Sequence, residues 1–100
     1  MDDKNIENNF KVLRGINKNP NSSQRQLASD LGFSLGKLNY CLNALRLKGL
    51  IKMKNFKSNP NKIGYVYILT PKGIREKSKL TLNFMKRMMK EYDELKKDLN

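Results

Sequence analysis

Apolar residues near the start of the chain recur at intervals of three and four. The positions with this spacing are Ile6, Phe10, Leu13 and Ile16. Because a helix turns every 3.6 residues, these side chains share one face, and the pattern predicts an amphipathic helix over about residues 2–18. The helix is expected to end before Pro20, since the residue that precedes a proline avoids helical backbone angles.

A second, shorter helix is predicted over about residues 24–31. Ser23 is a favourable N-cap, and Gln26, three residues later, completes the pattern of a capping box. Gly32 fits the left-handed position that ends many helices. Ser34 then offers a second N-cap, so residues 32–34 are expected to form a tight turn between two helices.

The third predicted helix, over about residues 35–48, has two unlike faces. One face is apolar and is expected to be buried: Leu35, Leu38, Leu42 and Leu45, with Cys41 on its flank. The other face is polar and contains Gly36, Lys37, Asn39, Tyr40 and Asn43. Leu47 also lies on this polar side, where the pattern does not explain it.

The pattern then changes to that of strands. Residues 51–56 alternate between apolar and basic side chains, and residues 65–70 are rich in β-branched and aromatic ones. Turn-forming residues between them predict a hairpin loop over 57–64. Thr70 and Pro71 then suit the N-cap and first position of a helix that nothing interrupts as far as about Leu99. The elements predict a mainly α fold with a small β-hairpin, of the α+β class.

Charge is distributed unevenly along this sequence. The chain has 21 Lys and Arg against 9 Asp and Glu, a formal charge of +12. Residues 31–75 contain nine basic side chains and no acidic one, which indicates a polyanionic partner. The alternative is a solvated surface in a protein with biased composition, since Lys and Asn are abundant. A general bias, however, would not remove acids from this whole segment.

Composition argues against several classes of protein. The chain has no His and a single Cys41, so neither an internal disulfide nor a catalytic imidazole is available. No enzyme activity, metal or cofactor is expected. The longest apolar run, residues 65–69, is far shorter than a membrane span, and the acidic start lacks the apolar segment of a secretory signal. A cytoplasmic protein is predicted.

The order of the elements is that of a winged helix-turn-helix. In this architecture the second helix of the pair enters the major groove of double-stranded DNA, and the hairpin contacts the flanking backbone or minor groove. The predicted base-reading surface comprises Gly36, Asn39, Tyr40 and Asn43. Predicted phosphate contacts are Ser23, Gln24, Ser34 and Lys37. Predicted wing contacts are Lys57, Asn59, Asn61 and Lys62. Each Asn could equally be an ordinary solvated side chain.

The same segments resemble the MarR-type regulators. Residues 23–34 resemble that family's helix-turn-helix entry, residues 38–51 its recognition helix, and residues 65–73 its second wing strand and the start of the next helix. The resemblance implies a bacterial homodimeric transcriptional regulator, usually a repressor. It also implies that Asn39 and Tyr40 occupy the base-contacting positions, although the family often has a small hydroxyl residue and Arg there. Residues 85–99 most resemble a small branch associated with exopolysaccharide gene clusters.

The last helix carries an apolar seam at intervals of three and four. Its members are Met85, Met88, Tyr92, Leu95 and Leu99. This heptad spacing predicts a homodimer seam, with packing inside one chain as the alternative. Residues 1–73 are therefore predicted to be the DNA-binding part and residues 74–100 the dimerisation helix of one continuous domain. The family commonly builds its effector pocket from terminal helices longer than those of this sequence, which makes a small-molecule effector doubtful.

Other functions compatible with this pattern are a protein–protein adaptor of winged-helix shape and a non-specific binder of DNA or RNA. An adaptor would not need an acid-free recognition face. A non-specific binder would show no preference for a palindrome. For Cys41, a redox switch competes with an inert packed thiol, and the absence of a resolving cysteine favours the inert thiol.

Overall fold

The computed structural model describes residues 3–55 and 65–99 of the chain. Its elements are α1 (Asp3–Lys18), α2 (Gln24–Leu31), α3 (Leu35–Leu47), β1 (Ile51–Asn55), β2 (Tyr65–Leu69) and α4 (Pro71–Lys97). The predicted order and the predicted fold class are confirmed. The helix and strand boundaries lie within two residues of those expected from the sequence.

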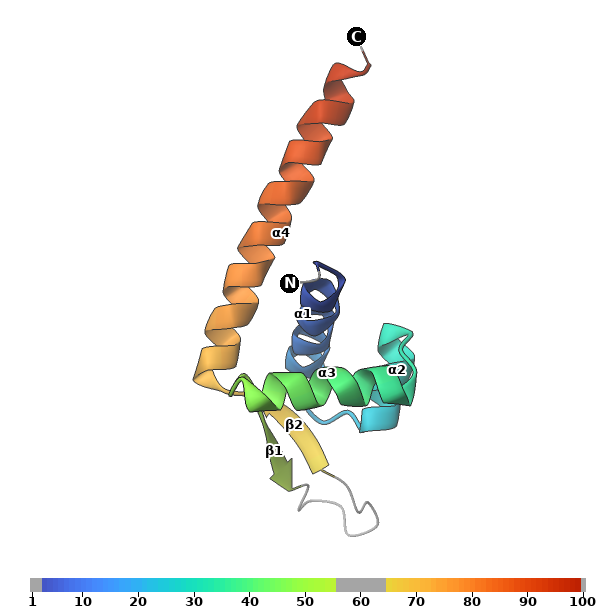
Figure 1. Ribbon diagram of the computed structural model, residues 1–100, viewed down its shortest axis with the longest axis vertical. Helices are drawn as coiled ribbons and strands as arrows, with labels where there is room; N and C mark the ends of the chain where they lie inside the picture. Colours follow the sequence, from blue (N-terminus) through green and yellow to red (C-terminus); the bar gives the residue numbers. More distant parts are fainter. Residues whose placement is uncertain (1–2, 56–64, 100) are drawn as a thin grey trace.

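The molecule has a small body and one long projecting helix. Helices α1, α2 and α3 form the body, the β1–β2 hairpin extends from one end of it, and α4 rises toward the opposite end (Figure 1). The principal extents are 61 × 25 × 24 Å, so α4 accounts for most of the length. The β1–β2 hairpin and the C-terminus therefore lie at opposite ends of the long axis.

The three body helices enclose one hydrophobic core. The buried side chains are Val12, Leu13 and Ile16 of α1, Leu27 and Ala28 of α2, and Leu38, Cys41, Leu42 and Leu45 of α3, joined by Leu50 and Ile51. Val12, which is fully buried, was not part of the predicted apolar face of α1. Leu35 was expected to be buried but is 44% exposed. It lies in the first turn of α3, one turn before Leu38, where the helix first reaches the core.

The hairpin is a two-stranded antiparallel sheet. Its register pairs Ile51 with Leu69 and Met53 with Tyr67. Ile51 is buried against the core, while Lys52 and Lys54 are exposed. The sheet thus anchors itself to the body at its base and carries basic side chains into solvent.

Helix α4 begins in close contact with the segment that follows α3. The Thr70 hydroxyl donates to the Gly49 carbonyl at 2.6 Å, and the Thr70 amide donates to the Leu50 carbonyl at 3.0 Å. Gly73 lies so near this segment that a Cβ at its position would come within 2.9 Å of the Leu50 carbonyl carbon and nearer still to its oxygen. Glycine is required here because any side chain would collide with backbone.

A second contact holds α4 against α1. The rings of Phe10 and Phe84 stack with centroids 4.8 Å apart and an angle of 16° between their planes. Arg87 lies over the Phe84 ring, with its guanidinium carbon 5.2 Å from the ring centroid. The helix is thus fixed to the body at its first turn and again at Phe84, with the residues beyond Phe84 projecting from it (Figure 1).

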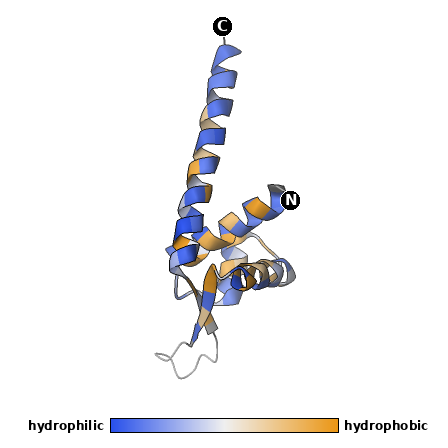
Figure 2. Ribbon diagram, turned by 60° about the vertical axis from the view of Figure 1, so that its left-hand side comes forward, coloured by the Kyte–Doolittle hydropathy of each residue, from blue (hydrophilic) through white to orange (hydrophobic). Residues whose placement is uncertain are grey.

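Hydropathy follows this division of the molecule. Apolar residues dominate the parts of α1, α3 and the strands that meet in the body, whereas α4 is mostly hydrophilic with apolar residues recurring along it (Figure 2). Among the described helices, none combines the length and the hydrophobicity needed to cross a membrane.

Candidate nucleic-acid interface

Two serine caps and one glycine fix the geometry of the helix pair α2–α3. The Ser23 hydroxyl accepts from the Gln26 amide at 3.1 Å, and the Ser34 hydroxyl accepts from the Lys37 amide at 3.1 Å. Gly32 has φ of +68°, the left-handed conformation predicted for it. The Gln26 side chain, expected to complete a capping box, donates its amide nitrogen to Asp30 at 2.8 Å. The serine caps fix where α2 and α3 begin, and Gly32 fixes where α2 ends.

Helix α3 presents its polar face to solvent. Leu38, Cys41, Leu42 and Leu45 on the rear face are at most 3% exposed. The front face consists of exposed side chains: Lys37, Asn39, Tyr40, Asn43, Arg46 and Leu47. No acidic residue lies anywhere on α3. This helix has the apolar rear and acid-free front that a helix needs to lie against phosphates in a major groove.

The two asparagines on this face are held by neighbouring side chains. The Gln24 side-chain amide nitrogen donates to Asn39 Oδ1, which ties the start of α2 to the middle of α3. The Arg46 guanidinium donates to Asn43 Oδ1 at 3.3 Å. Each oxygen keeps a second lone pair, so both amides still offer the acceptor and the donor that together read adenine.

Lys37 is positioned by the ring of Phe33, which was not among the predicted contacts. Its ammonium nitrogen lies 4.1 Å from the centroid of Phe33, a cation–π contact. Phe33 itself is half-buried against the core. The spacing of four residues across the start of α3 was the available signal. The contact holds a positive charge at the N-terminus of α3, and a helix N-terminus favours phosphate groups.

Gly36 lies in open space in the first turn of α3. A Cβ there would meet no atom within 4 Å, and its backbone angles are ordinary. The fold therefore does not require glycine at this position. A requirement for close approach to DNA, predicted from the sequence, stays a prediction.

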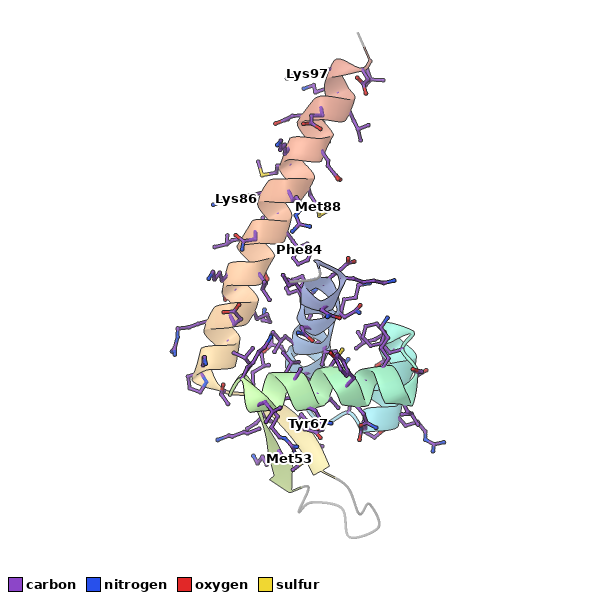
Figure 3. All side chains as sticks on the ribbon, viewed as in Figure 1. Met53, Tyr67, Phe84, Lys86, Met88 and Lys97 are labelled. Carbon is purple, nitrogen blue, oxygen red and sulfur yellow. The ribbon has the colours of Figure 1, made fainter. Side chains whose placement is uncertain are left out.

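The hairpin supplies basic residues that were not among the predicted contacts. Lys52 and Lys54 are exposed on β1, beside Met53 and its partner Tyr67 (Figure 3). Their alternation with apolar residues was the signal for a strand, and it also placed both charges on one face of it. The predicted wing residues Lys57, Asn59, Asn61 and Lys62 lie outside the described residues.

Cys41 is buried in the core, on the side of α3 opposite its exposed polar face. It is 3% exposed, and burial raises the pKa of its thiol above the ordinary value of 9.0, an effect that the charge of Lys37 partly offsets. A buried thiol with a raised pKa is a poor nucleophile. Among the described residues, no three His, Cys, Asp or Glu side chains lie close enough to hold a metal ion.

A hollow of about 320 Å³ lies between α1, the end of α3 and the start of α4. Its walls are mostly apolar: Ile6, Leu13, Leu45, Leu50 and Leu80. Lys48, Lys72 and Glu76 contribute polar groups, and Lys72 Nζ donates to the Lys48 carbonyl at 2.9 Å. The volume is at the lower end of the range of small-molecule sites. The hollow lies behind α3, away from its exposed polar face.

The predicted dimer seam is exposed in the single chain. Met85, Met88, Tyr92 and Leu95 are 53–68% exposed, and Leu99 is 86% exposed just beyond the end of α4. Leu82 and Met89, which the heptad pattern did not include, are 58% and 63% exposed. Met88 projects from the same side of α4 as Phe84, whereas Lys86 projects from the opposite side (Figure 3).

Comparison with known proteins places the fold. Residues 7–52 match the family model described as winged helix-turn-helix DNA-binding. Among curated protein sequences none matches the chain.

Solved structures match more of the chain. The transcriptional repressor CouR, bound to a 23-mer DNA duplex, is 26% identical with a TM-score of 0.73 over 86% of this chain and 59% of its own. Streptococcus pneumoniae FabT in complex with DNA is 26% identical with a TM-score of 0.64, over 86% of this chain and 58% of its own. Staphylococcus aureus MarR, in complex with salicylate and kanamycin, is 20% identical with a TM-score of 0.70 over 86% and 56%.

This chain thus spans between half and two thirds of the length of these three solved proteins. The matched region includes the two helices whose caps and exposed face are described above. Residues 7–52 are thus similar to winged helix-turn-helix DNA-binding domains, and the chain has the fold of the solved MarR-type regulators.

Proposed function

We propose that this chain is a sequence-specific transcriptional regulator, a repressor, that binds a pseudo-palindromic DNA operator as a homodimer. The observation that carries the proposal is the exposed, acid-free face of α3, supported from behind by a buried apolar face. Two recognition helices would occupy major grooves about one helical turn, 10–10.5 bp, apart. The DNA complexes of the structurally similar CouR and FabT support this use of the fold.

The proposed interface divides its work between two groups of residues. Asn39, Tyr40 and Asn43 would read base edges, because Asn pairs with the N6 and N7 groups of adenine. The phosphate contacts would come from the ends of the two helices, from Lys52 and Lys54, and from the wing residues Lys57, Asn59, Asn61 and Lys62. Because phosphate contacts do not depend on the base sequence, only the first group would determine which operator sequence is bound.

The resemblance of residues 85–99 to the exopolysaccharide-associated branch supports a finer proposal, that the operator lies near genes for such a polymer. Genomic capture of DNA bound by the protein would test it directly.

Selection of bound duplexes from a random DNA pool, at about 150 mM salt with RNA as competitor, tests the main proposal. At this ionic strength non-specific binding weakens to about 10⁻⁴–10⁻⁶ M. Enrichment of a two-fold-related motif is the expected result. Equal recovery of all sequences would contradict the proposal and favour a non-specific binder. Failure to recover any DNA would favour an adaptor, and loss of DNA to the competitor would favour an RNA partner.

Variants of the two groups test the division of work. Asn39→Ala or Asn43→Ala is expected to reduce discrimination between bases while leaving non-specific affinity in place. Lys57→Ala with Lys62→Ala is expected to weaken binding to all sequences alike, and to reduce the slope of log K against log salt by about 0.9 for each lost phosphate contact. A parallel loss of affinity in both sets of variants would show that the two groups do not have separate roles.

A further inference from the structure

The C-terminal half of α4 has an apolar face that nothing in the described chain covers. Met85, Met88, Tyr92 and Leu95 are more than half exposed, and they follow Phe84, whose ring packs on Phe10. Their spacing of three and four residues makes a continuous seam along the helix. A helix that projects into water with such a seam is completed by another apolar surface.

The charged residues beside the seam indicate which partner surface covers it. In heptad terms Met85, Tyr92 and Leu99 are a positions, and Met88 and Leu95 are d positions. Glu91 and Asp98 are then the acidic g positions, and Lys96 is a basic e position. All three side chains are exposed on the described chain. In coiled coils the e and g residues face those of the partner helix and determine orientation.

Only one orientation of two identical helices brings opposite charges together here. In a parallel pair, each g residue faces the e residue of the next heptad, so Glu91 faces Lys96 of the partner subunit. Two-fold symmetry makes this contact twice. In an antiparallel pair, g residues face g residues, and Glu91 meets the acidic Asp98 of the partner subunit. The charge pattern therefore favours the parallel arrangement.

We propose that residues 85–99 pair with the same segment of a second copy as a parallel, in-register, two-stranded coiled coil, with Glu91 opposite Lys96 of the partner subunit. This inference deepens the proposed function and rests on it in one respect, the need for two recognition helices on one duplex. Parallel pairing places both bodies at the same end of the helix pair, because each body lies at the N-terminal end of α4 (Figure 1). Antiparallel pairing would place them at opposite ends.

Charge reversal distinguishes the two orientations by the sign of its effect. In the parallel dimer, Glu91→Lys creates two Lys–Lys contacts, and the dissociation constant from sedimentation equilibrium is expected to rise about five- to tenfold at low salt. Adding Lys96→Glu is expected to restore dimerisation. Glu94→Lys is the matched control, since it makes the same charge change at an outward-facing c position. Stronger dimerisation of Glu91→Lys would overturn the parallel arrangement, since its lysine would then meet Asp98.

Cross-linking tests the register without DNA. In a Cys41→Ala background, Met85→Cys and Leu95→Cys are each expected to form disulfide-linked dimers on mild oxidation, because like positions face each other in a parallel, in-register pair. The outward-facing Lys90→Cys is expected to stay monomeric. An antiparallel pair allows at most one of the two sites to meet itself, since they lie about 15 Å apart along the helix. Cross-linking at one site only, or at neither, would overturn the proposal.

The test separates this inference from the proposed function. Dimers that cross-link at both sites but select no DNA motif would sustain the coiled coil and refute the regulator. Selection of a palindromic motif without cross-linking at both sites would sustain the regulator and place its dimer contact elsewhere.

Discussion

The Gly73–Leu50 contact leads to a sharp prediction about stability. Gly73→Ala would place a methyl group against the backbone carbonyl of Leu50, within 2.9 Å of the carbonyl carbon. Backbone cannot rotate away as a side chain can, so α4 must move. That movement would disturb the two hydrogen bonds from Thr70 to Gly49 and Leu50.

The magnitude follows from the terms involved. Overpacking costs about 1–3 kcal/mol, and each disturbed hydrogen bond costs about 1 kcal/mol. The better helix propensity of alanine returns at most about 1 kcal/mol. A net loss of about 3 kcal/mol in the free energy of unfolding is expected, which lowers the Tm of a domain of this size by more than 10 °C.

Urea unfolding followed by circular dichroism, at one fixed protomer concentration, measures this loss. Gly36→Ala is the matched control, because Gly36 is also in the first turn of a helix but has open space around it. It is expected to leave stability unchanged or raise it by up to about 1 kcal/mol. Equal stability of the two variants would contradict this prediction and show that the approach of α4 to Leu50 is not tight in solution.

Three further predictions concern contacts described above. Gln24→Ala and Asn39→Ala are each expected to weaken binding to the selected operator. In a double-mutant cycle measured by DNA titration, the double variant is expected to lose less binding free energy than the sum of the two single losses. Additive losses would mean that Gln24 does not position Asn39. Because the pKa of Cys41 is raised, its contribution to stability is complete at neutral pH and is lost as pH rises above the ordinary value of 9.0. Because Cys41 is also only 3% exposed, its alkylation by iodoacetamide at pH 8 is expected to be slower in the folded protein than in urea, and equal rates would show an accessible thiol. Phe84→Ala is expected to cost about 3 kcal/mol in urea unfolding, since it removes the ring stacked on Phe10, whereas the exposed Met88→Ala should change monomer stability by less than about 0.5 kcal/mol.

The helices and strands of this chain were predictable because local signals agreed with one another. Ser23, Gly32 and Ser34 each carry a chemical preference for the position that they occupy, and the structure confirms all three. The recognition face was likewise visible, since exposure on a helix follows from a period of 3.6 residues.

Contacts between distant segments were not predictable in the same way. The close approach of Gly73 to Leu50 depends on how α4 packs against the body. The sequence does not distinguish a helical glycine that contacts backbone from one that has open space around it. The Gln24–Asn39 contact joins residues fifteen apart across a turn whose angle is set by the whole core. Leu35 was misassigned for a related reason, because periodicity gives the direction of a side chain but not the turn at which the helix reaches the core.

The contacts at Gly73 and Phe84 fix the direction in which the rest of α4 projects from the body. Gly73 and Phe84 are eleven residues apart, so the helix is clamped at points about 16 Å from each other along its axis. The middle of the exposed seam, at Tyr92, lies about 28 Å beyond Gly73. A change of about 5° in the angle between α4 and the body would move that point by about 2.5 Å relative to the body. In the proposed dimer the displacement doubles and exceeds the rise of one base pair, about 3.4 Å. The stiffness of this clamp would therefore determine how strictly the protein measures the spacing between half-sites.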